Sequence, residues 1–432
     1  MSEAKQIVSN TFSSAQEVTG NLWRRTKGDK VIWAIVILLT MVSILVVYSS
    51  IGSLAYRMNK STESYLFRQV GYICLGVIII YFAHRVNYTI YSRVASILFI
   101  ISVPLLLYTL KYGSHINDAS RWIKLPVINL TFQTSDLAKL ALFMYMSRLL
   151  SRHQNVIKDF KKGFLPLIIP VGIICILIAP ANLSTALLIG GIALLLMFIG
   201  RIRVRHILLV VGAALIPLIF LVSVASHYYN QTDQVSEDLP AIFSFGRMPT
   251  WVKRVQDFMY ADKEDASYQI QQAKIAIATG GIFGKGPGKS EQRNFLPHPY
   301  SDFIYAIIIE EYGLVGGAII LLIYLLFLFR SIKLFQRCPY AFGAFLAVAL
   351  SFTLVIQALV NMAVNVNLFP TTGVTLPLVS MGGSSLLFTC FSIGIILSVA
   401  RNVEDAEGKN AQLATQQTED VLNEEFENEN DD

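Results

Sequence analysis

The sequence is short of charge. Charged residues make up 15% of the 432 residues, whereas hydrophobic residues make up 54%. A typical soluble domain carries about 25% charged residues, so the composition excludes an ordinary soluble enzyme. Apolar runs of about 20 residues recur along the chain, and each is long enough to cross a hydrocarbon core of roughly 30 Å. The composition therefore predicts an all-α polytopic membrane protein.

Cysteine is also scarce. The four cysteines are Cys74, Cys175, Cys338 and Cys390. Three lie within apolar runs and Cys338 lies in a short basic loop, so we expect no disulfide outside the cell. Their spacing matches no metal site. The sequence also lacks a repeat with a period of roughly 20–50 residues, which argues against a solenoid.

Apolar runs predict ten transmembrane helices, at 31–53, 67–84, 88–110, 133–151, 163–180, 182–200, 204–226, 301–329, 340–364 and 376–400. Basic residues fill the loops after the fourth, sixth and eighth spans, so these loops and both termini are predicted to be cytoplasmic. These residues are Arg148, Arg152, Lys158, Lys161, Lys162, Arg201, Arg203, Arg205, Arg330, Lys333 and Arg337. The other side receives a loop at 111–132 and a long extracytoplasmic loop at 227–300, between spans 7 and 8.

Two polar segments flank the ten-span domain, which is predicted at 31–400. Residues 1–30 form a cytoplasmic N-terminal tail, and the apolar run that follows is too long for a signal-peptide core. Residues 401–432 contain eleven acidic and two basic residues. Such a segment is predicted to be a disordered cytoplasmic tail, which either keeps the protein soluble or docks a partner.

Asp302 is the most informative polar residue. It lies where the long loop runs into an apolar helix, beside His298, Tyr300 and Ser301. A carboxylate at a membrane boundary is unfavourable without a partner or a function, and one partly shielded from water suits a general base. The alternative is a helix N-cap, because Ser and Asp are both good capping residues.

A glycine-rich segment precedes Asp302. Residues 280–289 read Gly-Gly-Ile-Phe-Gly-Lys-Gly-Pro-Gly-Lys. Glycines let backbone N–H groups approach a ligand closely, and Lys285 and Lys289 add positive charge, which together suit a phosphate or pyrophosphate. A flexible turn after the helix predicted from Tyr268 to Gly280 is the alternative. The segment is not a Walker loop.

Two further groups of polar residues lie near the outer ends of predicted spans. Asp136 and Lys139 share one helix face, which favours an internal ion pair, whereas Arg121 beside Trp122 is better placed to meet a ligand. Later in the chain, an asparagine pair and a broken helix indicate either a polar cavity or tight packing of small residues. The residues of this second group are Asn361, Asn365, Pro377, Gly382 and Gly383.

Several linked motifs resemble the SEDS family (shape, elongation, division and sporulation), whose members include FtsW, RodA and SpoVE. The similarity covers about residues 31–401, and its end is most similar to the division member FtsW. The motifs are Tyr268-Gln269, Gly280-Gly-x-x-Gly-Lys-Gly286, Phe295-Leu-Pro with Asp302-Phe-Ile, Glu310-Glu-x-Gly313 and Pro377-x-x-Ser-x-Gly-Gly-Ser-Ser385.

The resemblance implies a peptidoglycan glycosyltransferase of the cytoplasmic membrane, at the division septum, that polymerises lipid II. It implies Asp302 as the catalytic residue, and a class B penicillin-binding protein and other divisome membrane proteins as partners. The candidate substrate-binding residues are Arg121, Trp122, Lys139, Arg247, Arg254, Gln269, Lys285, Lys289 and Ser384. The leaving pyrophosphate is stabilised by some of these cations or by a divalent cation, magnesium or manganese.

The sequence departs from the family pattern at several positions. Asp136 stands where Glu is usual, Asn182 where Asp is usual, and Tyr300 where His is usual. Asn182 is therefore not assigned an acid role, and Tyr300 argues against an obligatory histidine relay to Asp302. The competing functions are a lipid II flippase or transporter, and a non-catalytic division scaffold.

Overall fold

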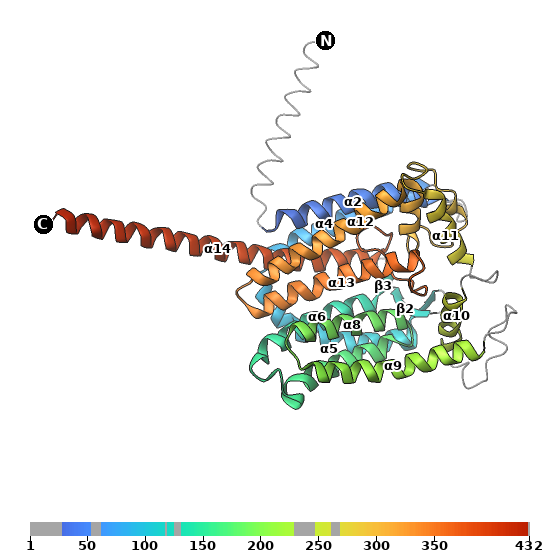
Figure 1. Cartoon of the computed structure of the whole chain (residues 1–432), viewed down its shortest axis with the longest axis horizontal. Coiled ribbons are helices and arrows are strands. Elements are labelled where there is room, and N and C mark those ends of the chain that lie inside the picture. Colours follow the sequence, from blue (N-terminus) through green and yellow to red (C-terminus); the bar gives the residue numbers. More distant parts are fainter. Residues whose placement is uncertain are drawn as a thin grey trace, which may run out of the picture.

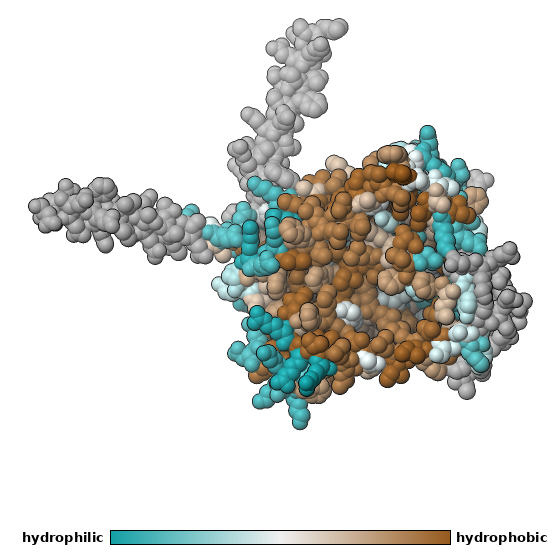
Figure 2. Space-filling model, viewed as in Figure 1, coloured by the Kyte–Doolittle hydropathy of each residue, from teal (hydrophilic) through white to brown (hydrophobic). Residues whose placement is uncertain are grey.

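The computed structural model describes residues 28–52, 62–116, 119–124, 131–228, 247–260 and 268–430. The predicted N-terminal tail therefore lies almost entirely outside the described residues. The described chain forms a bundle of long helices that run side by side (Figure 1). On the face that Figure 2 shows, a broad apolar band covers the bundle and hydrophilic residues gather at its two ends, as expected of a protein that spans a membrane.

Eight helical segments are long and apolar enough to cross a membrane. They are α2 (Lys30–Ser50), α4 (Thr62–Arg85), α5 (Tyr88–Tyr112), the π-helix η2 (Phe160–Phe164) with α7 (Leu165–Ile178), α9 (Val204–His227), α12 (Ile304–Arg337), α13 (Ala341–Asn365) and α14 (Ser384–Asn430). The chain is therefore a multi-pass membrane protein.

Two more helices coincide with predicted spans but lack this signal. Helix α6 (Thr134–Arg152) carries Asp136, Lys139 and two arginines, whereas α8 (Leu183–Ile199) is apolar but has only 17 residues. Between α6 and α7 lies the short 3-10 helix η1 (Gln154–Val156). The count of ten spans thus stays a prediction, because it depends on α6 and α8.

The loop predicted at 111–132 corrects the all-α expectation. It forms a small antiparallel sheet of β1 (Ser114–Ile116), β2 (Ala119–Lys124) and β3 (Thr131–Gln133), in the order β1-β2-β3. Trp122 is paired with Gln133, the residue that precedes α6. A connection this short between two helices satisfies its backbone N–H and C=O groups by pairing with itself.

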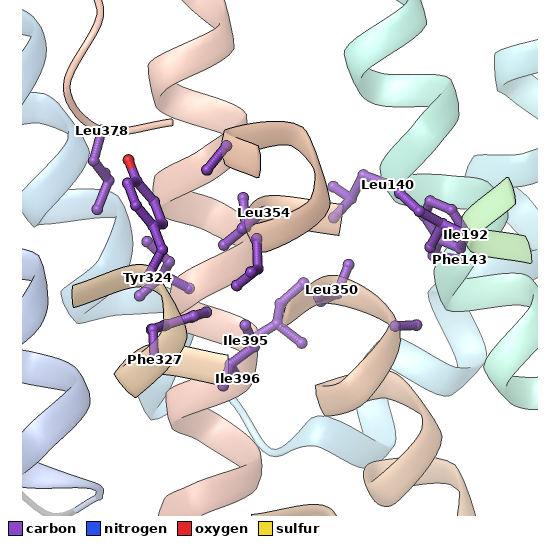
Figure 3. Close-up of a cluster of buried hydrophobic side chains, with 14 of the residues drawn as sticks. Leu140, Phe143, Ile192, Tyr324, Phe327, Leu350, Leu354, Leu378, Ile395 and Ile396 are labelled. Carbon is purple, nitrogen blue, oxygen red and sulfur yellow. The ribbon is translucent and has the colours of Figure 1, made fainter. Parts of the chain in front are cut away.

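Helix α13 lies at the centre of the bundle and packs against α6, α8, α12 and α14. In its most apolar stretch 78% of the residues are buried, against 11% for α9 at the periphery. Figure 3 shows part of this core, where Leu350 and Leu354 lie between Tyr324 and Phe327 on one side and Leu140 and Phe143 on the other. The polar residues of α13 are therefore placed inside the protein.

The segment between α9 and α12 contains α10 (Met248–Met259), α11 (Tyr268–Gly280) and the 3-10 helix η3 (Gln292–Asn294). The helix predicted from Tyr268 to Gly280 is confirmed as α11. Figure 1 shows α10 and α11 at the same end of the bundle as β2 and β3. The polar segments that the sequence singled out therefore gather at one end of the molecule.

The helix boundaries correct two further expectations. Helix α14 begins at Ser384 rather than near 376, because residues 366–383 leave the helical conformation. It then continues to Asn430, where the sequence predicted a disordered tail. The tail is rich in Glu, which is a good helix former, and it contains no proline that would end the helix.

Candidate active site

The backbone of residues 300–302 is held firmly. Asn361 and Asn365 of α13 each donate a side-chain hydrogen bond of 2.9 Å to the carbonyl oxygen of Asp302. The Ser380 hydroxyl donates to the carbonyl of Ser301 at 2.7 Å, and the amide of Met381 donates to the carbonyl of Tyr300 at 3.0 Å. These bonds use backbone carbonyls, so they position the Asp302 carboxylate without occupying it.

Asp302 does not cap α12. The residue at the N-cap position is Phe303, whose side chain makes no capping hydrogen bond. The Asp302 carboxylate instead accepts a hydrogen bond of 2.8 Å from the Ser301 hydroxyl. The half-buried side chain therefore lacks the capping role that the sequence offered as an alternative.

Three amides line one face of α13. Gln357, Asn361 and Asn365 are spaced four residues apart, so their side chains follow one another along the helix. Gln357 donates to the carbonyl of Thr375 at 3.0 Å and Asn361 to that of Val374 at 2.7 Å. The row of amides thus ties the irregular segment 366–383 and Asp302 to the same rigid helix.

A cavity of about 410 Å³ opens beside Asp302. Its walls come from several membrane helices, from the sheet and from the irregular segment. The residues that matter below are Arg68 and Tyr72 of α4, Trp122 of β2, Asp136 and Lys139 of α6, Asn182 and Thr185 at the start of α8, His298, Tyr300, Asp302, Gln357, Gly382 and Gly383. Of the residues interpreted as bordering a polar cavity, Gly382 and Gly383 line this one, whereas Asn361, Asn365 and Pro377 are not among its lining residues.

Lys139 contacts two polar side chains at the wall of this cavity. Its Nζ lies 3.4 Å from Oδ1 of Asp136 and donates to Oε1 of Gln357 at 3.0 Å. The predicted ion pair is present, and both of its members also face the cavity. The second oxygen of Asp136 is buried and has no hydrogen-bond partner among the residues that the structure describes.

A second cavity, of about 300 Å³, lies on the other side of Asp302. It is lined by Thr250, Lys253, Arg254 and Asp257 of α10, Gln269 of α11, and Phe303, Val364, Thr371 and Thr372. Asp302, Gly373 and Val374 line both cavities. Gly373 has a φ of 67°, and a Cβ there would lie 3.7 Å from Oδ2 of Asp302, so glycine suits this wall.

Arg254 is the charged neighbour of Asp302 in the second cavity. Burial lowers the pKa of Arg254 and the positive charge of Arg247 lowers it further, whereas the carboxylates of Asp302 and Asp257 raise it. Arginine remains ionised under such shifts. The charge of Arg254 is therefore held in a partly desolvated place, where it interacts strongly with an anion.

The glycine-rich segment lies outside both cavities. Lys285 donates to Oε1 of Glu310 at 3.0 Å, and the backbone amides of Lys285 and Gly286 donate to the carbonyls of Glu310 and Glu311 at 2.9 Å. Lys289 is exposed to solvent. The amides of Gly284, Lys285, Gly286 and Lys289 are thus paired with backbone carbonyls of the protein itself.

The other predicted site residues lie on different elements of the structure. Arg121 lies in β2, and its side chain is outside what the structure describes. Arg247 precedes α10 and donates to the carbonyl of Ala181 at 2.6 Å. Ser384 begins α14 and its hydroxyl accepts from the amide of Gln133 at 3.3 Å, while the carbonyl of Pro377 accepts from the Tyr324 hydroxyl.

No group of three or more His, Cys, Asp or Glu side chains is placed to hold a metal ion among the residues that the structure describes. Asp136 and Asp302 line the same cavity. They are the acidic side chains of that cavity that a divalent cation could use.

A family model described as "Cell cycle protein", which covers FtsW, RodA and SpoVE, matches residues 29–405. The chain belongs to the FtsW/RodA/SpoVE family. The probable peptidoglycan glycosyltransferase FtsW of Geobacter sp. (strain M18) is 33% identical over 390 residues, which cover 89% of this chain and 100% of the relative. Stage V sporulation protein E of Bacillus subtilis (strain 168) is 30% identical over 386 residues, which cover 88% and 98%.

Solved structures share the fold of this family member. A chain from a peptidoglycan synthase complex superposes with a TM-score of 0.67 at 23% identity, covering 87% of this chain and 98% of that one. The rod shape determining protein RodA of Thermus thermophilus gives a TM-score of 0.59 at 23% identity, covering 87% and 97%. At this identity the comparison shows a common architecture.

Arg68 and Gln357 of this FtsW/RodA/SpoVE member line the larger cavity, although neither was among the predicted site residues. Arg68 is a cation near the start of a predicted span, and Gln357 lies one helical turn before Asn361. The four-residue spacing of the amides could have revealed Gln357. Asn182, which was not assigned an acid role, caps α8: its side-chain oxygen accepts a hydrogen bond of 3.3 Å from the amide of Thr185.

Proposed function

We propose that the protein is a peptidoglycan glycosyltransferase that polymerises lipid II into glycan strands for septal synthesis in cell division. The observation that carries the proposal is the position of Asp302, whose carboxylate lies on the wall between two polar cavities. A transferase that joins two saccharides needs two adjacent binding places with a base between them. The FtsW relatives, which are named peptidoglycan glycosyltransferases, support the same conclusion.

Asp302 acts as the general base. Its carboxylate takes the proton from the 4-hydroxyl of the acceptor sugar as that oxygen bonds to the anomeric carbon of the donor. The bond from the anomeric carbon to the lipid diphosphate breaks, and the diphosphate leaves with the electron pair. Lys139 and Arg68 line the larger cavity and supply positive charge for the leaving group. General-base help of this kind contributes roughly 10²–10⁴-fold to the rate.

We infer that the chain has ten spans and that this chemistry takes place on the outer face of the cytoplasmic membrane. With α6 and α8 counted, an even number of crossings puts both ends of the bundle domain on the same side, and the basic loops after the fourth, sixth and eighth spans identify that side as cytoplasmic. The amide of Gly28 donates to Glu404 at 2.7 Å, and Arg330 pairs with Asp29 at 2.7 Å, so the start of α2, α12 and α14 meet at one end. The cavities lie among α10, α11 and the sheet at the other end, which Figure 1 shows to be opposite.

A class B penicillin-binding protein is the proposed partner. The solved peptidoglycan synthase complex with the same fold is described as coordinating polymerization and crosslinking. A partner with transpeptidase activity would supply the crosslinking step here, with other divisome membrane proteins bound beside it. Lipid II reaches the larger cavity from the membrane.

The test compares Asp302→Asn with the wild type in lipid II polymerisation, in detergent and with the cognate partner present. Asn keeps the shape of the side chain and removes the base, so we expect the rate to fall by about 10²–10⁴-fold. Asp159→Asn is the matched control, because Asp159 caps the π-helix η2 far from the cavities. Equal polymerisation by Asp302→Asn and wild type would refute the assignment.

A further inference from the structure

Helix α10 presents two different faces. Met248, Trp251, Val252 and Val255 pack against Leu221, Val224 and Ala225 of α9. The side chain of Gln256 donates to the carbonyls of Ala225 and Tyr228, at 2.9 and 3.2 Å. Together with the bond from Arg247 to Ala181, these contacts anchor α10 on the ends of α8 and α9. The helix is therefore a fixed platform.

The opposite face of α10 is polar and lines the smaller cavity. Thr250, Lys253, Arg254 and Asp257 follow the spacing of one helix face, and all four border the cavity. Gln269 of α11 and the hydroxyls of Thr371 and Thr372 complete the wall, and Asp302 closes it toward the larger cavity. This arrangement combines two cations with several groups that can hydrogen-bond to hydroxyls.

The two cavities differ in what can reach them. Helices α4, α6, α8 and α13 all contribute to the larger cavity, so a chain lying among membrane helices has access to it. The smaller cavity is built from α10, α11 and loops, and Val364 near the end of α13 is its main contribution from a membrane helix. A lipid-linked diphosphate therefore fits the larger cavity, and a part of the substrate without lipid fits the smaller one.

We propose that the smaller cavity binds the lipid-free, carboxylate-bearing saccharide end of a substrate, which places this end against Asp302. Arg254 and Lys253 pair with carboxylates of the peptide that the saccharide carries, and Asp257, Gln269 and the threonines accept or donate hydrogen bonds to sugar hydroxyls. The inference rests on the proposed glycosyltransferase function, since it assigns the two parts of that substrate to two cavities.

Binding of two half-substrates tests the inference without turnover. One probe is a disaccharide-peptide with free carboxylates and no lipid, and the other is farnesyl diphosphate. Arg254→Gln is expected to weaken disaccharide-peptide binding about tenfold or more, because a charge-assisted hydrogen bond is lost. Its affinity for farnesyl diphosphate should stay unchanged. Lys139→Gln is expected to show the reverse pattern, and Arg254→Lys to retain part of the saccharide affinity.

An amidated probe separates a specific contact from a general loss of charge. Wild-type protein should bind a disaccharide-peptide with amidated carboxylates less tightly than the acid form, whereas Arg254→Gln should not distinguish the two. Lys253→Gln repeats the comparison at an exposed position that cannot disturb packing. Thermal unfolding in detergent confirms that each variant is folded.

Three results would overturn the inference. They are unchanged saccharide binding by folded Arg254→Gln and Lys253→Gln, a loss of farnesyl diphosphate binding in Arg254→Gln, and no saccharide binding by the wild type up to the solubility of the probe. Polymerisation by the wild type and its loss in Asp302→Asn would then still stand, so failure of the inference is distinguishable from failure of the proposed function.

Discussion

Two polar segments at the same end of the molecule have different roles. In the glycine-rich segment 280–289, backbone amides donate to the carbonyls of Glu310 and Glu311, and Lys285 pairs with Glu310. In the segment that ends at Asp302, neighbouring side chains bind the carbonyls and leave the carboxylate facing two cavities. The first segment thus serves packing, whereas the second presents a carboxylate to the two cavities.

Glu310 holds the glycine-rich segment and the residues after it against α12. Its carboxylate is fully buried and accepts from Lys285, the Ser290 hydroxyl and the amides of Glu291 and Gln292. The hydrogen bond from Lys285 raises the pKa of that lysine. A raised lysine pKa stabilises the fold below the unfolded value of about 10.4, and the contribution is lost only as pH rises through the folded value. Lys285 therefore stays ionised at neutral pH.

The largest effect is expected from a substitution that disrupts the packing of the glycine-rich segment 280–289. A Cβ at Gly284 would lie 2.2 Å from the carbonyl oxygen of Glu311, and the residue has a φ of 82°. Gly284→Ala should therefore lower the free energy of unfolding by about 3–5 kcal/mol, from the positive φ and the overpacked backbone together. Thermal unfolding in detergent measures this loss.

Gly288 is the matched control for that change. Its φ is 75°, but a Cβ there meets nothing within 4 Å. Gly288→Ala should cost only the backbone term, about 1–2 kcal/mol. Equal destabilisation by the two variants would show that the close approach to α12 does not hold the segment.

A smaller effect is expected from the row of amides. Asn361→Ala and Asn365→Ala each remove a bond that positions the Asp302 carbonyl. Misplacement of a reacting group by about 1 Å can cost 10²-fold in rate, so lipid II polymerisation per folded molecule should fall by about 10–100-fold. Asn402→Ala, which removes an amide bonded to the carbonyl of Ser398 within α14, is the control. Full activity in the α13 variants would mean that Asp302 is positioned by other contacts.

The smallest effect is expected from one of two lysines that were both candidate substrate-binding residues. Lys289 is exposed and lies outside the cavities, whereas Lys139 faces the larger one. Lys289→Gln should leave the polymerisation rate within about twofold, as expected of a surface substitution. Lys139→Gln should reduce it at least tenfold, because a charge near the leaving group is lost. A strong defect in Lys289→Gln would restore the glycine-rich segment as a diphosphate site.

Local features of the sequence predicted much of the fold. Helices occupy all ten apolar runs, and α11 ends at the glycine pair that was expected to stop it. Hydrophobicity is a property of each short segment, so it can be read without knowing the neighbours. The small sheet at 114–133 and the late start of α14 were not predicted, because short strands and broken helices depend on distant partners.

The sequence by itself determined a multi-pass membrane protein and singled out Asp302 as a carboxylate in an unusual place. Only the tertiary structure decided what surrounds that carboxylate. The amides that hold it lie 59 and 63 residues further along the chain, and the two cavities draw on segments from Arg68 to Ser385. Such contacts form when helices pack, and packing depends on the shape of the whole bundle rather than on any one segment.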